Sequence, residues 1–174
     1  LELPQTIDVA KAKRNVAIVG GGPAGLEAAR TLAEKGHTVT LFEANDSLGG
    51  QINIAIRSPR RRDLQGITDW RTQELKRLGV AVKLNSYVDA SDLSEAGFDA
   101  IVVATGGMPK ALEIPGGNHV LESWDVLSGS KRVTGDVLIY DDHGGTQALD
   151  LAENLAQSGA KVELVTPERN MSVD

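Results

Sequence analysis

Residues 15–44 have the sequence N-V-A-I-V-G-G-G-P-A-G-L-E-A-A-R-T-L-A-E-K-G-H-T-V-T-L-F-E-A, and this stretch decides the fold. It begins with a short apolar run at residues 16–19, of the kind that is buried in a parallel sheet. A glycine-rich turn and a helical segment follow, and a second apolar run occupies residues 38–42. This order of strand, turn, helix and strand predicts a βαβ unit of the dinucleotide-binding type.

The glycines of this turn are spaced for phosphate binding. Gly20, Gly22 and Gly25 fill the three positions of G-x-G-x-x-G. The first permits a tight turn, the second lets a pyrophosphate approach the backbone, and the third lets the helix pack closely on the sheet. Pro23 suits the first helical turn, where its missing N–H costs nothing. The free N–H groups and the positive end of the helix dipole then face the phosphates.

Glu43 ends the second predicted strand, about 20 residues beyond the glycines. A carboxylate at this position can accept hydrogen bonds from both hydroxyls of an adenosine ribose, and it would repel a 2′-phosphate. The complete order of strand, glycines, helix, strand and acid favours a true adenine-dinucleotide site over a purely structural βαβ unit.

Composition limits the classes of function. The 174 residues suffice for one ordinary domain or two small ones. A net charge of −6, with only two residues each of Trp, Tyr and Phe, disfavours nucleic-acid binding. The absence of cysteine excludes disulfides, thiolate metal sites and C-x-x-C redox chemistry within these residues. The three isolated histidines lack metal-ligand spacing, so we expect no metal.

The chain has no apolar run long enough to span a membrane, so we expect no membrane partner and a cytoplasmic location. Residues 1–14 lack a starting Met and the apolar core of a signal peptide. They indicate a polar linker that enters a domain, and hence a piece of a longer protein.

The rest of the chain alternates predicted strands and helices, which indicates an α/β class with parallel sheets and flanking helices. In the first half we expect a loop at 44–59, a helix at 64–78, strands at 80–84 and 100–103, and an irregular connection at 87–95. After a turn at 115–118 we expect a short helix at 122–127, strands at 136–140 and 161–165, and a helix at 147–157. The predicted domains are residues 15–112 and residues 113–174, after the linker at 1–14.

Two more glycine-rich segments are candidates to border a ligand. S-L-G-G-Q at residues 47–51 suits a backbone lying against a ligand, although an ordinary turn explains it equally well. A-T-G-G-M-P at residues 104–109 follows the carboxyl end of a predicted strand, where ligands of open α/β sheets lie. Four arginines between them form a basic run, which we interpret as a solvated face, with docking of a partner domain as the alternative. These are Arg57, Arg60, Arg61 and Arg62.

The second half repeats the first with a damaged fingerprint. An alignment of the halves places three residues at the glycine positions: His143, Gly145 and Ala148. Ala is acceptable at the third position, whereas His is not acceptable at the first. Asp141 and Asp142 would oppose a pyrophosphate, and Thr166 replaces the ribose acid. Thr166 and Arg169 could suit a 2′-phosphate, but the acidic turn disfavours it. We expect a structural repeat that does not bind NAD(H) or NADP(H).

The segments V-A-I-V-G-G-G-P-A-G-L-E-A-A, L-F-E-A, L-G-G-Q-I-N-I-A and A-T-G-G-M-P together resemble flavoproteins with two dinucleotide-binding domains. The third of these and K-L-N-S-Y-V look like the C-terminal half of the multidomain old-yellow-enzyme relatives. These relatives, the NADH:flavin oxidoreductase family, include trimethylamine and histamine dehydrogenases, N-demethylases and dienoyl-CoA reductase. The degenerate I-Y-D-D-H-G-G-T-Q-A-L-D turn is similar to the amine dehydrogenase and demethylase branch. The resemblance extends from Val16 to about Glu168.

The resemblance implies a Rossmann-like flavoprotein fold with two dinucleotide-binding domains, the second truncated or degenerate. It implies FAD or ADP here, and outside this chain an N-terminal FMN barrel and an iron–sulfur cluster. An electron-carrier protein would be the acceptor, and the chain alone would not turn over substrate. The implied ligand contacts are Gly20, Gly22, Pro23, Ala24 and Gly25 (pyrophosphate), Glu43 (ribose), Val88 (adenine, through its backbone), and the further cofactor-binding residues Ala44, Gly50, Gln51, Ala104, Thr105 and Gly106.

Alternative functions stay open. The chain could be a non-catalytic scaffold whose bound ADP is structural. It could instead be part of an NAD(P)H-dependent enzyme of the dienoyl-CoA-reductase type, or an independent ferredoxin or disulfide reductase. The missing cysteines disfavour a disulfide reductase, and the damaged second turn disfavours every NAD(P)H-dependent alternative. Catalytic residues for any substrate are expected elsewhere in the protein.

Overall fold

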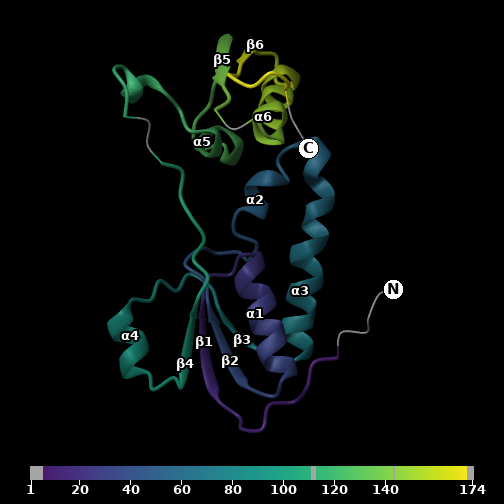
Figure 1. Cartoon of the computed structure of the whole chain (residues 1–174), viewed down its shortest axis with the longest axis vertical. Coiled ribbons are helices and arrows are strands. Elements are labelled where there is room, and N and C mark those ends of the chain that lie inside the picture. The colour runs from purple at the N-terminus through teal and green to yellow at the C-terminus, as the bar shows by residue number, and fades with distance from the viewer. Residues whose placement is uncertain (1–5, 111–112, 143, 172–174) are drawn as a thin grey trace. The chain divides into compact units, whose positions relative to one another are not determined.

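The structure is a computed structural model that describes residues 6–110, 113–142 and 144–171. The chain forms two compact units (Figure 1), each considered by itself. The first contains the residues up to Ile52 together with Gln65–Gly107, and the second contains Asn53–Leu64 and the residues from Met108 on. Residues 53–64 therefore group with the second unit although they lie between two segments of the first. Whether these units are the two predicted domains stays a prediction.

A four-stranded parallel sheet forms the centre of the first unit, in the order β3-β2-β1-β4. Its strands are β1 (Asn15–Val19), β2 (Thr38–Phe42), β3 (Ala81–Lys83) and β4 (Ala100–Val103). Parallel neighbours need a crossover connection, and helices α1 (Pro23–Glu34), α3 (Gln65–Arg77) and α4 (Ala90–Glu95) lie in those connections. The predicted α/β class is confirmed.

Helices cover both faces of this sheet. Alternate residues of each strand point to opposite faces, and apolar residues lie on both, so each face needs a covering layer. On one face α1 and α3 pack on the sheet, and Leu26 and Leu75 join Ile18 and Leu41 in the main core. On the other face Leu93 of α4 packs with Ala17 and Phe42. Figure 1 shows α4 on the opposite side of the strands from α1 and α3. The carboxyl ends of the strands are left to the connecting loops.

The irregular connection expected at residues 87–95 is wrong, because α4 lies there. Its N-cap Asp89 accepts hydrogen bonds from the backbone N–H groups of Ser91 and Asp92, and the Asp92 carboxylate accepts the Asp89 N–H. This is a capping box with Asp in the place of Glu, which stabilises the first turn of a short helix. The loop expected at 44–59 also contains a helical turn, α2 (Ile52–Ala55).

The second unit contains a two-stranded parallel sheet of β5 (Asp136–Tyr140) and β6 (Lys161–Val165). Its helical segments are α5 (Ser123–Ser128), α6 (Thr146–Gln157) and the 3-10 turns η1 (Pro59–Leu64) and η2 (Gly117–His119). Ile139 of β5 packs against Leu151 and Leu155 of α6. The predicted strand, helix and strand of the repeat are therefore present.

Part of the basic run contacts α6 within this unit. Arg61 Nε lies 3.0 Å from Asp150 Oδ2, and the buried Ser58 hydroxyl donates to Asp150 Oδ1 at 3.1 Å. Arg60 Nε lies 2.6 Å from Glu153 Oε2. No sequence pattern predicted these contacts, which attach the segment around η1 to α6.

Candidate functional site

The turn between β1 and α1 leaves the N-terminus of the helix open to an anion. Gly22 is the N-cap, with extended backbone (φ −75°, ψ −179°) and no side-chain capping hydrogen bond. Pro23 follows, and the first turn of α1, which the structure describes in full, contains no acidic side chain. The first N–H groups of a helix have no partner inside it, so an uncapped N-terminus is suited to a phosphate.

Two glycines of the fingerprint are required by contacts within the protein. Gly20 has φ +107°, and a Cβ there would lie 2.4 Å from the Ala104 carbonyl oxygen. A Cβ at Gly25 would lie 1.9 Å from the Gly20 carbonyl oxygen. Neither backbone oxygen can move aside easily. These contacts agree with the predicted roles in the tight turn and in close packing of helix on sheet.

The two glycines between them differ sharply from each other. A Cβ at Gly21 would lie 2.6 Å from Leu48 Cδ2 and 2.9 Å from Glu43 Oε2. A Cβ at Gly22 would meet nothing closer than Gly50 Cα at 3.9 Å, which is an ordinary contact. The backbone angles of Gly22 also suit any residue. Nothing around Gly22 in the described protein requires glycine there.

The two other predicted loops meet the fingerprint turn. Gly49 N–H donates to the Gly21 carbonyl at 2.9 Å, and Gly50, with φ +52°, passes so close that a Cβ would lie 3.0 Å from Gly22 Cα. Gln51 Nε2 donates to the Gly107 carbonyl at 3.3 Å. Residues 49–51 and 104–107, far apart in sequence, are thus linked beside the N-terminus of α1.

Glu43 lies beneath the turn, with 6% of its surface exposed. Its Oε2 accepts the Gly21 N–H at 2.6 Å. Its Oε1 accepts two hydrogen bonds from Asn45, one from the backbone N–H at 2.8 Å and one from Nδ2 at 2.7 Å. The acid thus tethers the fingerprint turn to the end of β2.

The remaining predicted contact residues lie at or near the surface of the first unit. Pro23, Ala24, Ala44 and Thr105 are exposed, and the Val88 side chain is half-buried against the second-face core. Gly21, Asn45 and Leu48 are further parts of the site that were not among the contacts predicted from the sequence. The triple glycine was a signal for Gly21, whereas no sequence signal marked Asn45.

The second turn is longer than the first. Two residues, Gly20 and Gly21, separate β1 from the N-cap Gly22, whereas residues 141–144, four in number, separate β5 from the N-cap Gly145. Gly145 has φ −88° and ψ −175°, close to the angles of Gly22. The predicted match between Gly22 and Gly145 therefore agrees with the helix starts, and the extra residues lie before it.

The strand ends then place Asp141, and not His143, at the first glycine position. Asp141 N–H donates to the Val165 carbonyl at 2.8 Å, as Gly20 N–H does to the Phe42 carbonyl at 2.8 Å. The sequence alignment was wrong here because it allowed no insertion between strand and helix. His143 itself lies outside the described residues.

An internal carboxylate holds this second turn. Asp141 is 7% exposed, and its Oδ1 accepts the Gly144 N–H at 3.1 Å. A Cβ at Gly144 would lie 2.8 Å from Glu168 Cγ, so a second acidic side chain packs against the same turn. The first turn is held by Glu43, which directly follows β2, whereas the second turn is held by Asp141, a residue of the turn itself.

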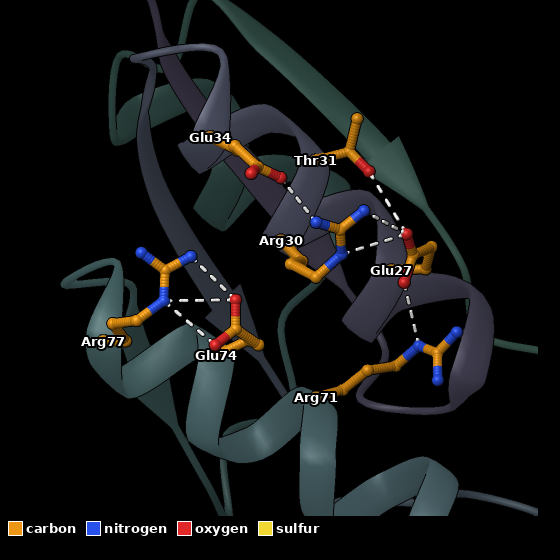
Figure 2. A network of polar contacts seen from close by, with 7 residues as sticks. All are labelled: Glu27, Arg30, Thr31, Glu34, Arg71, Glu74 and Arg77. Carbon is orange, nitrogen blue, oxygen red and sulfur yellow. Dashed lines mark hydrogen bonds and ion pairs between the residues drawn. The ribbon is translucent and has the colours of Figure 1, made fainter. Parts of the chain in front are cut away.

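An ion-pair network on the helical face holds α1 against α3 (Figure 2). Glu27 of α1 accepts hydrogen bonds from Arg30 of the same helix, at 2.7 Å, and from Arg71 of α3, at 2.9 Å. Both guanidinium groups also lie over the Trp70 ring, 5.6 and 5.5 Å from its centre. The hydrogen bond from Arg30 is the main reason why the pKa of Glu27 is lowered. The network fixes the helix whose N-terminus faces the site.

The described part of the chain contains neither a candidate metal-binding group nor a candidate membrane-spanning helix. No group of three or more His, Cys, Asp and Glu side chains is placed to hold a metal ion among the described residues. Within the same ranges, no helix combines the length and the apolar character that crossing a bilayer requires.

A family model described as pyridine nucleotide-disulphide oxidoreductase matches residues 14–172. The chain belongs to the pyridine nucleotide-disulphide oxidoreductase family. This membership agrees with the open helix N-terminus and the glycine turn of the first unit, and with the parallel sheet flanked by helices.

Three similar proteins show which members of the pyridine nucleotide-disulphide oxidoreductase family this chain resembles. The chain is 42% identical over 173 residues to the "Probable N-methylproline demethylase" of Rhizobium meliloti (strain 1021), covering 99% of this chain and 26% of that protein. It resembles the structure of 6-hydroxypseudooxynicotine amine oxidase from Pseudomonas geniculata N1 (TM-score 0.88, 33% identity, 97% of this chain and 27% of that one). It also resembles histamine dehydrogenase from Rhizobium sp. 4-9 (TM-score 0.85, 28% identity, 97% and 26%).

The chain thus spans about a quarter of the length of these relatives, 26% and 27% of the first two. The predicted resemblance to the C-terminal region of amine dehydrogenases and N-demethylases is confirmed, as is the Rossmann-like flavoprotein fold.

Proposed function

We propose that the first unit binds the ADP portion of an adenine dinucleotide, as FAD or as ADP itself. The observation that carries this proposal is the contrast at Gly22. Contacts within the protein explain Gly20, Gly21 and Gly25, whereas the space beside Gly22 is open and its backbone angles suit any residue. A pyrophosphate against the uncapped N-terminus of α1 accounts for glycine at this position.

Different residues of the chain would bind different parts of the ligand. The pyrophosphate would lie against residues 20–25, the ribose against Glu43 and Ala44, and the adenine against the Val88 backbone. The bordering residues would be Gly50, Gln51, Ala104, Thr105 and Gly106. If the ligand is FAD, its ring supplies redox chemistry when bound, whereas ADP supplies none.

The test is Gly22→Ala. A Cβ at this position fits the protein, so we expect the melting temperature to fall only as far as Ala is a poorer N-cap than Gly. It would occupy the approach path of the pyrophosphate, so ADP and FAD should bind about tenfold more weakly or worse, which is about 1.4 kcal/mol or more. Isothermal titration calorimetry with both ligands measures this.

Gly66→Ala is the matched control. A Cβ at Gly66, in α3, has no atom within 4 Å, so the same chemical change is made away from the turn. Affinity should be unchanged, and the helix should be slightly more stable, by up to about 1 kcal/mol. Full ADP and FAD affinity in Gly22→Ala would refute the proposed site.

For the second unit we propose a structural role without NAD(P)(H). The buried carboxylate of Asp141 lies in the turn where a pyrophosphate would have to approach, and Glu168 packs beside it. Two acids beside the phosphates would repel them.

For the whole protein we propose a flavin-dependent oxidoreductase, an amine dehydrogenase or N-demethylase. The support is the likeness to a demethylase, an amine oxidase and histamine dehydrogenase, proteins that this chain covers only in part. Its FMN barrel and iron–sulfur cluster would lie outside these residues, and an electron-carrier protein would accept electrons. A non-catalytic ADP-binding scaffold is the alternative. Mass spectrometry of nucleotide released from the purified protein separates them, because bound ADP favours the scaffold and FAD the redox module.

A further inference from the structure

Glu43 has little hydrogen-bonding capacity left for a ribose. A carboxylate offers about four lone-pair positions. Oε1 accepts two N–H groups of Asn45, and Oε2 accepts the N–H of Gly21. Three of the roughly four positions are therefore used, and the remaining one is on Oε2.

A ribose diol needs two acceptors if both hydroxyls bind the same carboxylate. Oε2 can accept one hydroxyl as it stands, whereas Oε1 can accept the other only if one Asn45 donor leaves. The backbone N–H is fixed, because the Asn45 carbonyl accepts the Asn85 N–H at 2.8 Å and the Glu43 carbonyl accepts the Ser86 N–H at 2.8 Å. The Asn45 side chain can leave by rotation about its own bonds.

We propose that the side-chain amide of Asn45 competes with one ribose hydroxyl for Oε1 of Glu43, and so sets how strongly this site distinguishes ribose from deoxyribose. The inference rests on the proposed ADP site. With the amide present, the second hydroxyl only replaces another donor, so it adds little affinity. Without the amide, the hydroxyl gains a hydrogen bond to a buried, charged acceptor, which is among the stronger kinds.

The test compares ADP with 2′-deoxy-ADP and 3′-deoxy-ADP in the wild-type protein and in Asn45→Ala, by calorimetry. For the hydroxyl that faces Oε1, removal should weaken wild-type binding by less than about threefold, and should weaken Asn45→Ala binding by about tenfold or more. Asn45→Ala keeps the backbone N–H bond to Glu43, and Asn45→Leu provides a second variant of similar size that lacks the donor.

Asp46→Ala is the control, because it changes the neighbouring exposed residue and keeps both Asn45 donors. It should show the wild-type ratios. If ADP binds and both analogues lose the same affinity in the wild type and in both Asn45 variants, this inference is wrong while the proposed site stands. If the wild-type protein binds neither ADP nor FAD, the proposed function itself is wrong.

Discussion

At the scale of the residue, Glu43 serves the fold as well as the proposed ligand. Its buried carboxylate accepts three N–H groups from Gly21 and Asn45. Glu43→Ala would leave the buried Gly21 N–H without its acceptor, so we expect the free energy of unfolding to fall by roughly 1–3 kcal/mol. ADP binding should also weaken, by roughly 1.5–3 kcal/mol, because a charge-assisted hydrogen bond is lost. Urea denaturation and calorimetry measure the two effects separately.

Gly22→Ala is the complementary variant, since it should lower affinity while costing no more stability than the replacement of an N-cap Gly by Ala. A Glu43→Ala protein as stable as the wild type would show that these hydrogen bonds do not hold the turn. Unchanged ADP and FAD affinity in Glu43→Ala would contradict its assignment to the ribose.

At the scale of the element, the α1–α3 network gives the first unit a defined response to pH (Figure 2). Hydrogen bonding and charge from Arg30 and Arg71 lower the pKa of Glu27. A lowered pKa in the folded state means that the unfolded chain binds the proton more tightly. The contribution of Glu27 is therefore complete above the ordinary glutamate value of about 4.3, and it is lost as the pH falls through the lowered pKa.

Glu27→Gln tests this response. At pH 7 the free energy of unfolding should fall by roughly 0.5–1 kcal/mol, because the side chain is 39% exposed and solvent screens the pairs. The difference from the wild type should shrink below about pH 4. Denaturation curves at both pH values measure it. Glu74→Gln removes a pair that lies within α3 alone and should have a smaller effect. A difference that grows in acid would contradict the network's role.

At the scale of the whole molecule, the second turn bears on whether the proposed oxidoreductase could take electrons from NADH or NADPH. We expect no binding of NADH or NADPH at micromolar concentrations, because Asp141 and Glu168 lie where phosphates would have to approach. A fluorescence titration of the nicotinamide measures this. Micromolar NADH binding that disappears in Gly145→Ala would contradict the prediction and would favour the NAD(P)H-dependent reductases.

Without a nicotinamide site, electrons would come from a substrate oxidised elsewhere in the protein. That direction of transfer is a proposal for the whole protein. The chain itself covers only about a quarter of the length of its relatives. Calorimetry with ADP addresses the first unit and the NADH titration addresses the second, so the two assignments can fail independently.

The sequence alone determined the α/β class, the βαβ unit and the places of Gly20, Gly25 and Glu43. These features depend on local spacing: apolar runs specify strands, and glycines at fixed intervals specify the turn between a strand and a helix. The helix α4 is also encoded locally, by the Asp89 capping box, in which Asp92 takes the place of the usual Glu.

Only the tertiary structure decided which groups meet. Gly21 and Glu43 are 22 positions apart, and Gln51 and Gly107 are 56 apart, so no short-range pattern marks either contact. The place of Asp141 followed from the pairing of β5 with β6, because Asp141 directly follows β5 and donates to the Val165 carbonyl. The extra residues of the second turn therefore lie between β5 and α6, where the sequence alignment allowed no insertion. Hydrogen bonds between distant segments set these positions, because a buried donor or acceptor must find a partner wherever the fold brings one within reach.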